Sequence, residues 1–286
     1  MDCHGEFMED TTAEYAAGEL LPTVPLLANC KVSIGAKTDL GRVRENNEDK
    51  FEFLIPSEPA VLATRGQVFI VCDGMGGHAA GQIASELAAK TFIDVYLSHP
   101  ATEIQEALVA ALNAANRYVF LVGQSVPNRR GMGTTFTALV LVQDQGYAVQ
   151  VGDSRLYRLR GEELKQLTDD HTYMDEMVKN GLLTPEQAAI HPQKHVLTRA
   201  VGVDEHVVCD VFTFSIQEGD TYFLCSDGIL NHVGDSEIHS ILHANGPGNA
   251  AWKLVGQALV GGGSDNATAL VVRVDEIERF DSSADN

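Results

Sequence analysis

Three strand-like runs follow one another with only tight turns between them, and this succession constrains the fold more than any other feature of the sequence. The runs are TTFTALVLV, YAVQVGDS and RLYRLR, within residues 134–160, and they are rich in residues that strands favour. Gln145–Gly146 and Asp153–Ser154 mark the two turns. Parallel neighbours need a long crossover connection, so this succession excludes a purely parallel sheet.

Helix-like segments come in pairs before and after these strands. Apolar residues recur mostly every three or four residues over 83–95 and from 107 towards Gly123, which predicts two amphipathic helices. The order of strands, helix pair, strands, helix pair and strand predicts an α+β fold of antiparallel sheets with helices packed outside them. The remaining elements are expected as strands at 32–39, 51–55, 68–73, 207–216, 222–226 and 267–274, and as helices at 235–243 and 249–259.

The ends of the chain and one internal segment differ from this pattern. Residues 1–30 are rich in acids and small residues, so we expect a mobile arm there, with a short helix near 12–20. Residues 31–275 form the folded domain, and 276–286 form a C-terminal tail. The polar, helix-like stretch at about 168–201 is too hydrophilic for a core, so we expect it to cover another part of the molecule.

Charge and cysteine content exclude several classes of protein. The chain has 286 residues and a formal net charge of −20, and an acidic surface repels phosphate backbones and anionic lipids, so nucleic acid and membrane are poor partners. The five cysteines form no CxxC pair, which argues against a zinc site or a disulfide framework and fits a reducing compartment. No secretory signal or membrane-length apolar run occurs, so we expect a cytoplasmic protein.

Acidic residues stand repeatedly at the ends of the apolar strands. Each one alone is compatible with an ordinary turn, but turn formation does not explain why such strands end again and again in an acid. Clustered carboxylates repel one another unless protons or cations neutralise them, and oxygen-only ligands favour Mg²⁺ or Mn²⁺ over zinc. A site for hard cations at one edge of the sheets is therefore expected, built from Glu48, Asp49, Asp73, Asp153, Asp227 and Asp265.

The residues after Asp73 carry almost no side chains, in the run DGMGG. Gly74 has no side chain to obstruct an ion held by Asp73, so its carbonyl can serve as a ligand. The later glycines keep the entry to the next helix open. A tight strand-to-helix turn without chemistry is the alternative, and a lone Asp–Gly pair would favour it.

Eight blocks of the sequence, in this order, resemble the signature of a known family. They resemble the metal-dependent serine/threonine protein phosphatases, the PPM or type 2C group, and its bacterial form fits best. The resemblance implies a four-layer α-β-β-α sandwich of two antiparallel sheets flanked by helix pairs. It makes residues 31–275 the phosphatase catalytic domain and 168–201 its flap. The blocks are RVRENNEDKF, VCDGMGGHAAGQIAS, GTTFTALVLV, VGDSRLYRLR, LTDDHT, HPQKHVLTRAVG, CSDGILNHV and SDNATALVV.

The resemblance also implies a centre with two Mn²⁺ or Mg²⁺ ions. Asp73 would bridge the two ions, and Asp227 and Asp265 would complete the protein ligands of the first. The Gly74 carbonyl and Glu48, directly or through water, would serve the second ion.

Three further roles are implied by the same resemblance. Asp49 would orient metal-bound water, and Asp153 would bind a third ion together with Asp227. Arg44 takes the position of the arginine that binds the substrate phosphate, since a planar guanidinium suits two phosphate oxygens. A surface arginine on a loop is the alternative for Arg44, and Arg42 is such a residue.

One departure from the family concerns the general acid. Met75 stands where eukaryotic members have a histidine proposed to protonate the leaving group, and methionine cannot do so. His78 lies nearby, but a histidine at a helix start more often caps or orients. His171, His191 and His195 lie in the flap segment, and we expect no catalytic role for them.

The expected function is hydrolysis of phosphoserine and phosphothreonine in proteins by a hydroxide held between the metals. The expected enzyme is a monomer that opposes a Hanks-type serine/threonine kinase and acts on phosphorylated proteins. Two alternatives are a phosphatase for small phosphoesters and a catalytically inactive, phosphatase-like module that binds or regulates. An inactive module should have lost metal ligands, whereas all the acids named above are present.

Overall fold

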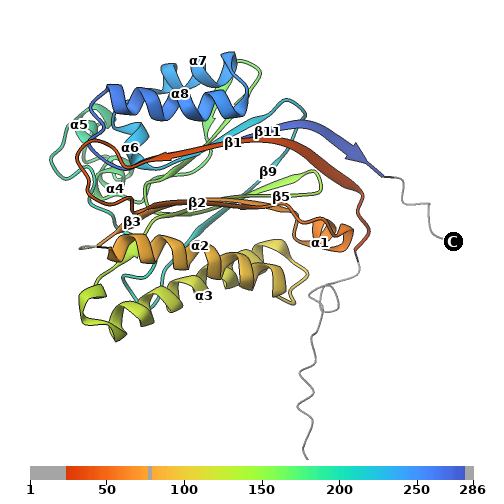
Figure 1. Ribbon diagram of the computed structural model, residues 1–286, viewed down its shortest axis with the longest axis horizontal. Helices are drawn as coiled ribbons and strands as arrows, with labels where there is room; N and C mark the ends of the chain where they lie inside the picture. Colours follow the sequence, from red (N-terminus) through yellow and green to blue (C-terminus); the bar gives the residue numbers. More distant parts are fainter. Residues whose placement is uncertain (1–23, 77–78, 281–286) are drawn as a thin grey trace, which may run out of the picture.

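Two antiparallel β-sheets pack face to face, and a pair of long helices covers the outer face of each (Figure 1). The computed structural model describes residues 24–76 and 79–280. Helices α2 (Ala80–Ser98) and α3 (Ile104–Ser125) cover one sheet, and α7 (Asp235–Ala244) and α8 (Pro247–Val260) cover the other. The expected four-layer sandwich is thus confirmed.

The first sheet has five strands in the order β1-β11-β10-β7-β8. Its two long strands pair from Ala28 opposite Arg279 to Asp39 opposite Ala267. The bounds are β1 Ala28–Asp39, β7 Arg155–Arg160, β8 Glu163–Gln166, β10 Thr221–Cys225 and β11 Ala267–Arg279.

Two expected boundaries change because β1 and β11 extend each other. The arm was placed at 1–30 and the tail at 276–286, but residues 28–30 and 276–279 form backbone pairs within this sheet. Each strand end supplies the hydrogen-bonding partners that the other needs. The helix expected near 12–20 lies outside the described residues.

The second sheet follows the order β2-β3-β5-β6-β9, and β4 pairs with β3. The turn between β5 and β6 lies at Gln143–Asp144 rather than at Gln145–Gly146, and Gln143 adopts a φ of 56°. Gly146 lies inside β6, where a side chain has no room because a Cβ would lie 2.2 Å from the Phe214 ring. The bounds are β2 Asp49–Leu54, β3 Gln67–Met75, β4 Gly133–Thr134, β5 Phe136–Val142, β6 Gln145–Val151 and β9 Asp210–Ser215.

Three apolar layers hold the sandwich together. Strands β3 and β5 are buried on both faces, since one face meets the other sheet and the opposite face meets α2 and α3. Phe69, Leu139, Tyr222 and Leu270 lie between the sheets and are fully buried. Burial of each such side chain contributes about 1.5–3 kcal/mol, so this layer fixes how the strand ends face one another.

Short elements were not expected from the sequence because they are too short to show a period. These are α1 (Pro59–Thr64), α6 (Asp227–Leu230) and the 3-10 helix η2 (Pro127–Arg129). None of the helices in the described part of the chain has the length and apolarity that crossing a membrane requires.

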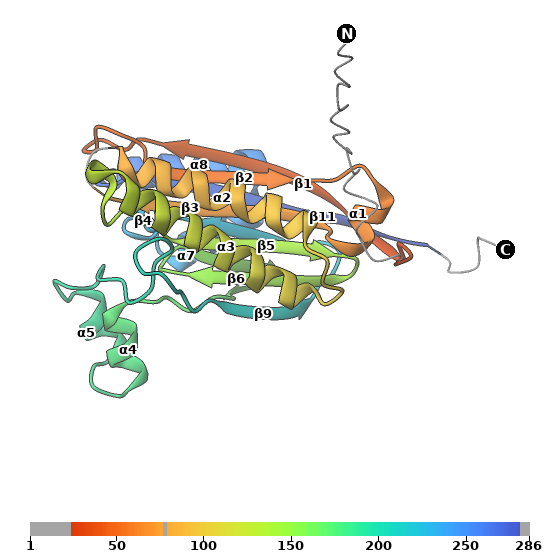
Figure 2. The same cartoon turned by 90° about the horizontal axis from the view of Figure 1, so that it is seen from below.

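The segment at 168–201 forms two short helices that project from one end of the sandwich (Figure 2). They are α4 (Tyr173–Lys179) and α5 (Pro185–Ala189). An isolated bridge between Thr172 and Leu197 closes the segment on itself, and a second bridge joins Val201 to Thr134 outside it. The start of the segment is attached by the His171 N–H, which donates to the Gly152 carbonyl at 2.9 Å. We call residues 168–201 the flap from here on.

Candidate metal centre

The acids predicted from the strand ends gather at the end of the sandwich that carries the flap. A cavity of about 900 Å³ is lined by five of them, and Arg44 and the Gly74 backbone also line it. The sixth, Asp49, lies beside Asp73 in the register of β2 and β3. The five acids in the cavity wall are Glu48, Asp73, Asp153, Asp227 and Asp265.

Strand β3 places Asp73 at the centre of this group, and two threonines fix its backbone. The Asp73 N–H donates to Thr135 Oγ1 at 2.8 Å, and the Asp73 carbonyl accepts from Thr134 Oγ1 at 2.9 Å and from the Thr135 N–H at 2.8 Å. Thr135 Oγ1 also lies 2.7 Å from Ser154 Oγ, next to Asp153. Thr135 therefore joins two of the acid-bearing segments, a role the sequence reasoning did not identify.

Burial, and after it mutual repulsion, raises the carboxyl pKa values in this group. Burial first, and then the charge of Asp49, raises the pKa of Asp73 well above its ordinary value. Burial raises the pKa of Asp49 to about 7, and burial together with Asp227 raises that of Asp153 to about 7. Such a cluster needs positive charge nearby to remain ionised at neutral pH.

Gly74 and Gly81 bring the start of α2 against the end of β3. A Cβ on Gly74 would lie 2.2 Å from the Gly81 carbonyl oxygen, and one on Gly81 would lie 2.8 Å from the Glu48 carboxyl carbon. Burial raises the pKa of Glu48, while the charge of Arg44 and the nearby Gly81 N–H lower it by less. The glycines are thus explained by close backbone packing that positions Glu48.

One carboxylate oxygen of Asp49 is held by hydrogen bonds, and the other has no hydrogen-bond partner among the described residues. Its Oδ2 accepts from Ser226 Oγ and from Thr268 Oγ1, each at 2.7 Å. Its Oδ1 is buried and has no partner among the described residues. Neither hydroxyl partner was predicted, because they lie far from Asp49 in the sequence.

Asn266 holds the loop that carries Glu48. Its Oδ1 accepts from the Glu48 N–H at 2.8 Å, and its Nδ2 donates to the carbonyls of Leu40 and Asn46 at 2.9 and 3.0 Å. Its own N–H donates to Asp265 Oδ1 at 2.8 Å. Asn266 thereby positions two predicted ligands at once.

Arg44 lies in the cavity wall, and its guanidinium contacts an acid. Its Nη2 is 2.7 Å from Asp265 Oδ2, and its side chain is 52% exposed. The predicted phosphate-binding residue and a predicted metal ligand are therefore paired with each other in this structure.

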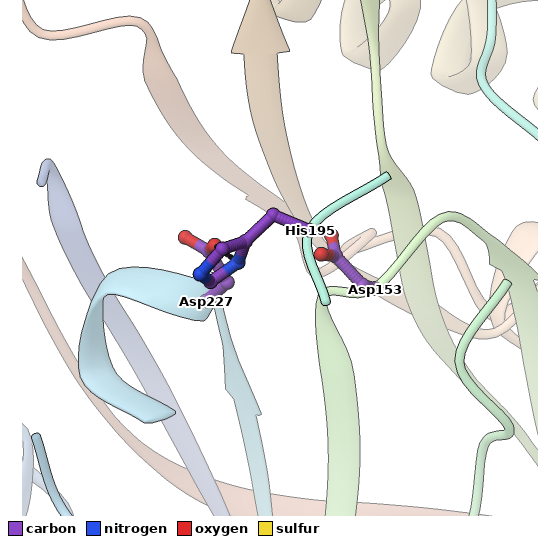
Figure 3. Close-up of side chains that lie close together, drawn as sticks. All are labelled: Asp153, His195 and Asp227. Atoms are coloured by element: carbon purple, nitrogen blue, oxygen red, sulfur yellow. Dashed lines mark ion pairs between the residues drawn. The ribbon is translucent and has the colours of Figure 1, made fainter. Parts of the chain in front are cut away.

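His195 is the residue in this region that sequence reasoning set aside. Its Nδ1 lies 3.3 Å from Asp227 Oδ2, and ligand atoms of Asp153, His195 and Asp227 all lie within 4.8 Å of one another (Figure 3). Hydrogen bonding to Asp227 raises the pKa of His195. His171 lies deeper and accepts from the Gly152 N–H, while His191 does not line the cavity and His78 is outside the described residues.

The donor set fits hard divalent cations. Glu48 Oε1, Asp49 Oδ1 and Asp227 Oδ1 are buried and lack hydrogen-bond partners among the described residues. Leaving such an atom unpaired costs about 1–3 kcal/mol, and more if it is charged. Carboxylate oxygens with a backbone carbonyl are the ligands that Mg²⁺ and Mn²⁺ prefer.

Known proteins share both the sequence and the architecture described above. The family model for protein phosphatase 2C matches residues 42–246. The serine/threonine phosphatase stp of Listeria monocytogenes is 38% identical over 247 residues, which cover 84% of this chain and 94% of that protein. The crystal structure of the Mycobacterium tuberculosis serine/threonine phosphatase PstP superposes with a TM-score of 0.77 at 35% identity, covering 86% of this chain and 99% of that one.

A solved structure with bound metal is also similar. The catalytic domain of the serine/threonine protein phosphatase PstP in complex with two manganese ions gives a TM-score of 0.74 at 34% identity, over 86% of this chain and 99% of that one. The extent of the family match and of both alignments leads to one conclusion: this chain belongs to the protein phosphatase 2C family and is a protein phosphatase.

Proposed function

We propose that this phosphatase removes phosphate from phosphoserine and phosphothreonine in proteins, using a centre of two Mn²⁺ or Mg²⁺ ions. The observation that carries the proposal is the gathering of six acids from distant strand ends, three of them with unpartnered buried oxygens. Ions bound there supply the Lewis acidity that makes water a nucleophile near neutral pH and that neutralises charge on the phosphoryl group.

The proposed ligands follow the family pattern. Asp73, Asp227 and Asp265 would hold the first ion, and Asp73 would share the second with Glu48 and the Gly74 carbonyl. The shared position suits Asp73 because it stands opposite Asp49 in the strand register and lines the same cavity as the other acids.

Two residues act on the reactants rather than on the ions. Asp49 is fixed by two hydroxyl donors, so its free oxygen can orient a water molecule towards the phosphoryl group. Arg44 is half exposed at the cavity wall, and it binds two phosphate oxygens through its planar guanidinium. To bind phosphate, Arg44 would leave its contact with Asp265, and Asp265 would then be free to hold an ion.

A protein substrate is favoured over a small phosphoester by a second cavity beneath the flap. It measures about 470 Å³ and shares Asp153, His195 and Asp227 with the first cavity. The side chains of Met174 and Val178 give it apolar walls. A chain that places its phosphorylated residue in the first cavity can place a neighbouring side chain in the second.

The proposal extends to the cellular setting. We infer that the enzyme works as a monomer in the cytoplasm and opposes a Hanks-type serine/threonine kinase. The catalytic domain, proposed as 31–275 from the sequence, includes the extended strand ends, with the flap as its mobile cover.

The test compares two substrates with Mn²⁺, with and without a chelator. We expect turnover of a phosphothreonine peptide and of p-nitrophenyl phosphate, and loss of both in the chelator. Val178→Glu should lower peptide turnover and leave p-nitrophenyl phosphate turnover unchanged, whereas Glu176→Ala, on the same helix outside the cavity wall, should change neither. Absence of turnover with any divalent metal would favour an inactive module, and equal loss of both substrates in Val178→Glu would contradict a protein-specific groove.

A further inference from the structure

A closed ring of hydrogen bonds holds Asp49 and includes two residues that have no role so far. Strands β1 and β11 place Thr38 directly opposite Thr268, and their hydroxyl oxygens lie 2.7 Å apart. Thr268 Oγ1 contacts Asp49 Oδ2 at 2.7 Å. On its other side, Thr38 Oγ1 lies 2.9 Å from Asn47 Nδ2, and Asn47 Oδ1 lies 3.1 Å from the Asp49 backbone nitrogen. The ring therefore starts at the backbone of Asp49 and ends at its carboxylate.

The two ends of the ring fix the direction of every bond in it. A backbone N–H can only donate, so Asn47 must turn its Oδ1 towards Asp49 and its Nδ2 towards Thr38. An ionised carboxylate can only accept, so Thr268 gives its single hydroxyl hydrogen to Asp49. Thr38 must then donate to Thr268, although the distance alone would allow either direction.

The second hydroxyl on Asp49 is directed in the same way. The Thr268 N–H donates to Ser226 Oγ at 3.0 Å, and Ser226 Oγ donates to Asp49 Oδ2 at 2.7 Å. Thr268 and Ser226 are both fully buried, so bulk water does not compete for these bonds. Asp49 Oδ2 thus receives two directed hydrogens, and this fixes the plane of the carboxylate and the direction in which Oδ1 points.

Thr38 and Asn47 lie away from the place where a substrate would bind. Both are half-buried, and together with Asp49 they line a separate cavity of about 380 Å³. Neither lines the cavity that contains Arg44 and the other acids. Any effect of these two residues on the reaction must therefore pass through Asp49.

We propose that Thr38 and Asn47 are positioning residues that hold the Asp49 carboxylate in one orientation through this directed ring. The inference rests on the proposed function, in which the free oxygen of Asp49 orients a water molecule. Without the ring the carboxylate can turn about its Cβ–Cγ bond, and Oδ1 no longer points in one direction. Turnover should then fall while substrate binding stays the same, because only the alignment of the reacting groups is lost.

The first experiment removes the donor in the middle of the ring. Thr38→Val keeps the branched side chain and loses the hydroxyl, so we expect kcat for p-nitrophenyl phosphate in Mn²⁺ to fall about tenfold with KM unchanged, the lower end of the effect of changing groups that support ligands. Thr38→Ser keeps the hydroxyl and should retain near-native kcat. Ser33→Ala is the control on the same strand, because that hydroxyl contacts Asp275 instead. A native kcat in Thr38→Val, or an equal loss in Thr38→Ser, would overturn the proposal.

The second experiment reverses the direction of the ring. Asn47→Asp keeps an acceptor for the Asp49 N–H but replaces Nδ2 with an oxygen that can only accept, so the Thr38 hydrogen turns away from Thr268. We expect a loss of kcat similar to that in Thr38→Val. Combining the two substitutions should add little to either loss, since both break the same path. If the two losses multiply instead, Asn47→Asp acts through its added charge, and the directed ring is contradicted.

The third experiment needs neither metal nor turnover. Urea unfolding in a chelator at pH 8 compares Thr38→Val in the native background and in Asp49→Ala. We expect Thr38→Val to lower the urea midpoint of the native protein and to lower that of Asp49→Ala by less, because residues in one hydrogen-bond network are coupled. Equal shifts in the two backgrounds would show that Thr38 does not act on Asp49. Absent turnover of the native protein would count against the phosphatase centre, whereas the ring would still be judged by this coupling.

Discussion

Single residues in this protein are placed by partners that are distant in the sequence. Asp49 lies opposite Asp73 in the strand register, and its carboxylate is fixed by Ser226 and Thr268 from the other sheet. Among the residues that the structure describes, no hydroxyl donates to the Asp73 carboxylate, and burial together with the neighbouring acids raises its pKa well above the ordinary value. The two acids therefore differ in role: Asp49 is held rigidly by hydrogen bonds, whereas Asp73 needs a nearby positive charge to remain ionised.

Asp73→Asn tests the bridging role. We expect turnover to fall by at least about a hundredfold, as for loss of one preorganised electrostatic group, together with loss of tight metal binding. The metal-free variant should be at least as stable as the native protein, because the change removes a charge from a repelling, buried group. Calorimetry for metal and thermal unfolding in a chelator measure both, and near-normal turnover would remove Asp73 from the bridge.

Arg44→Ala tests the phosphate-binding role. We expect a higher KM and weaker inhibition by inorganic phosphate, because two charge-assisted hydrogen bonds to the substrate are lost. Metal affinity should stay the same or rise, since Asp265 is released from its contact with Arg44 at 2.7 Å. Arg42→Ala is the matched control on the same loop. Unchanged KM and phosphate inhibition in Arg44→Ala would show that this arginine only pairs with Asp265.

At the scale of elements, the junction of β3 with α2 positions the metal centre. The strand ends at Met75 and the helix begins at Ala80, and the helix returns so closely that Gly81 contacts Gly74. The Gly74 N–H donates to the Glu48 carbonyl at 3.1 Å. One tight connection thus places Asp73 and Glu48 side by side.

Gly74→Ala should separate this junction. The added Cβ would lie 2.2 Å from one backbone oxygen and 2.6 Å from another, so β3, α2 or the Glu48 loop must move, at a cost of about 1–3 kcal/mol. Gly256→Ala is the control, because it lies inside α8 with nothing within 4 Å of its Cβ. That control should stabilise the protein by up to about 1 kcal/mol. Urea unfolding of both variants measures the difference, and equal stability would argue that the close approach is not required.

At the scale of the whole molecule, the sandwich brings strand ends from both sheets to one edge and buries like charges there. The apolar layer between the sheets fixes this arrangement without regard to the charges, so the acids are held together by burial elsewhere. The clustered carboxylates therefore lower the stability of the metal-free protein, and bound cations or protons reduce their repulsion.

The stability of the metal-free protein should consequently fall as pH rises. Asp49 and Asp153 have pKa values of about 7 in the folded chain against the ordinary 3.8. The folded state therefore binds more protons than the unfolded state between these values, and unfolding becomes easier as pH increases through about 7. The ion pair between His195 and Asp227 also makes the protein less stable as pH rises, because its contribution to stability is lost as pH passes the raised pKa of His195.

We expect the Tm in a chelator to be a few degrees higher at pH 6 than at pH 8. Mn²⁺ should raise the Tm more at pH 8, where fewer protons compete for the ligands. Burial lowers the pKa of His171 from its ordinary value of 6.5, so that group opposes the trend below about pH 6.5, and the comparison does not extend below pH 6. A Tm in chelator that is unchanged or higher at pH 8 would contradict an electrostatically strained edge.

The sequence by itself determined the strands, the long helices and the acids of the centre. Apolar residues that alternate along a strand, or recur every three or four residues along a helix, show which side of the segment is buried. These patterns were enough to predict two kinds of feature: the sandwich of sheets and helices, and the acids at strand ends such as Asp73 and Asp227. The family resemblance added a separate role for each acid. Short elements such as α6 were missed because one turn of helix has no period.

Only the tertiary structure decided which distant side chains meet. The pairing of Arg44 with Asp265, the hydroxyls that hold Asp49 and the approach of His195 to Asp227 join segments far apart in the chain. Gly74 likewise has to be glycine because the neighbouring helix approaches it so closely. These contacts arise when separate layers pack against each other, and a local pattern of residues carries no record of what lies across the interface.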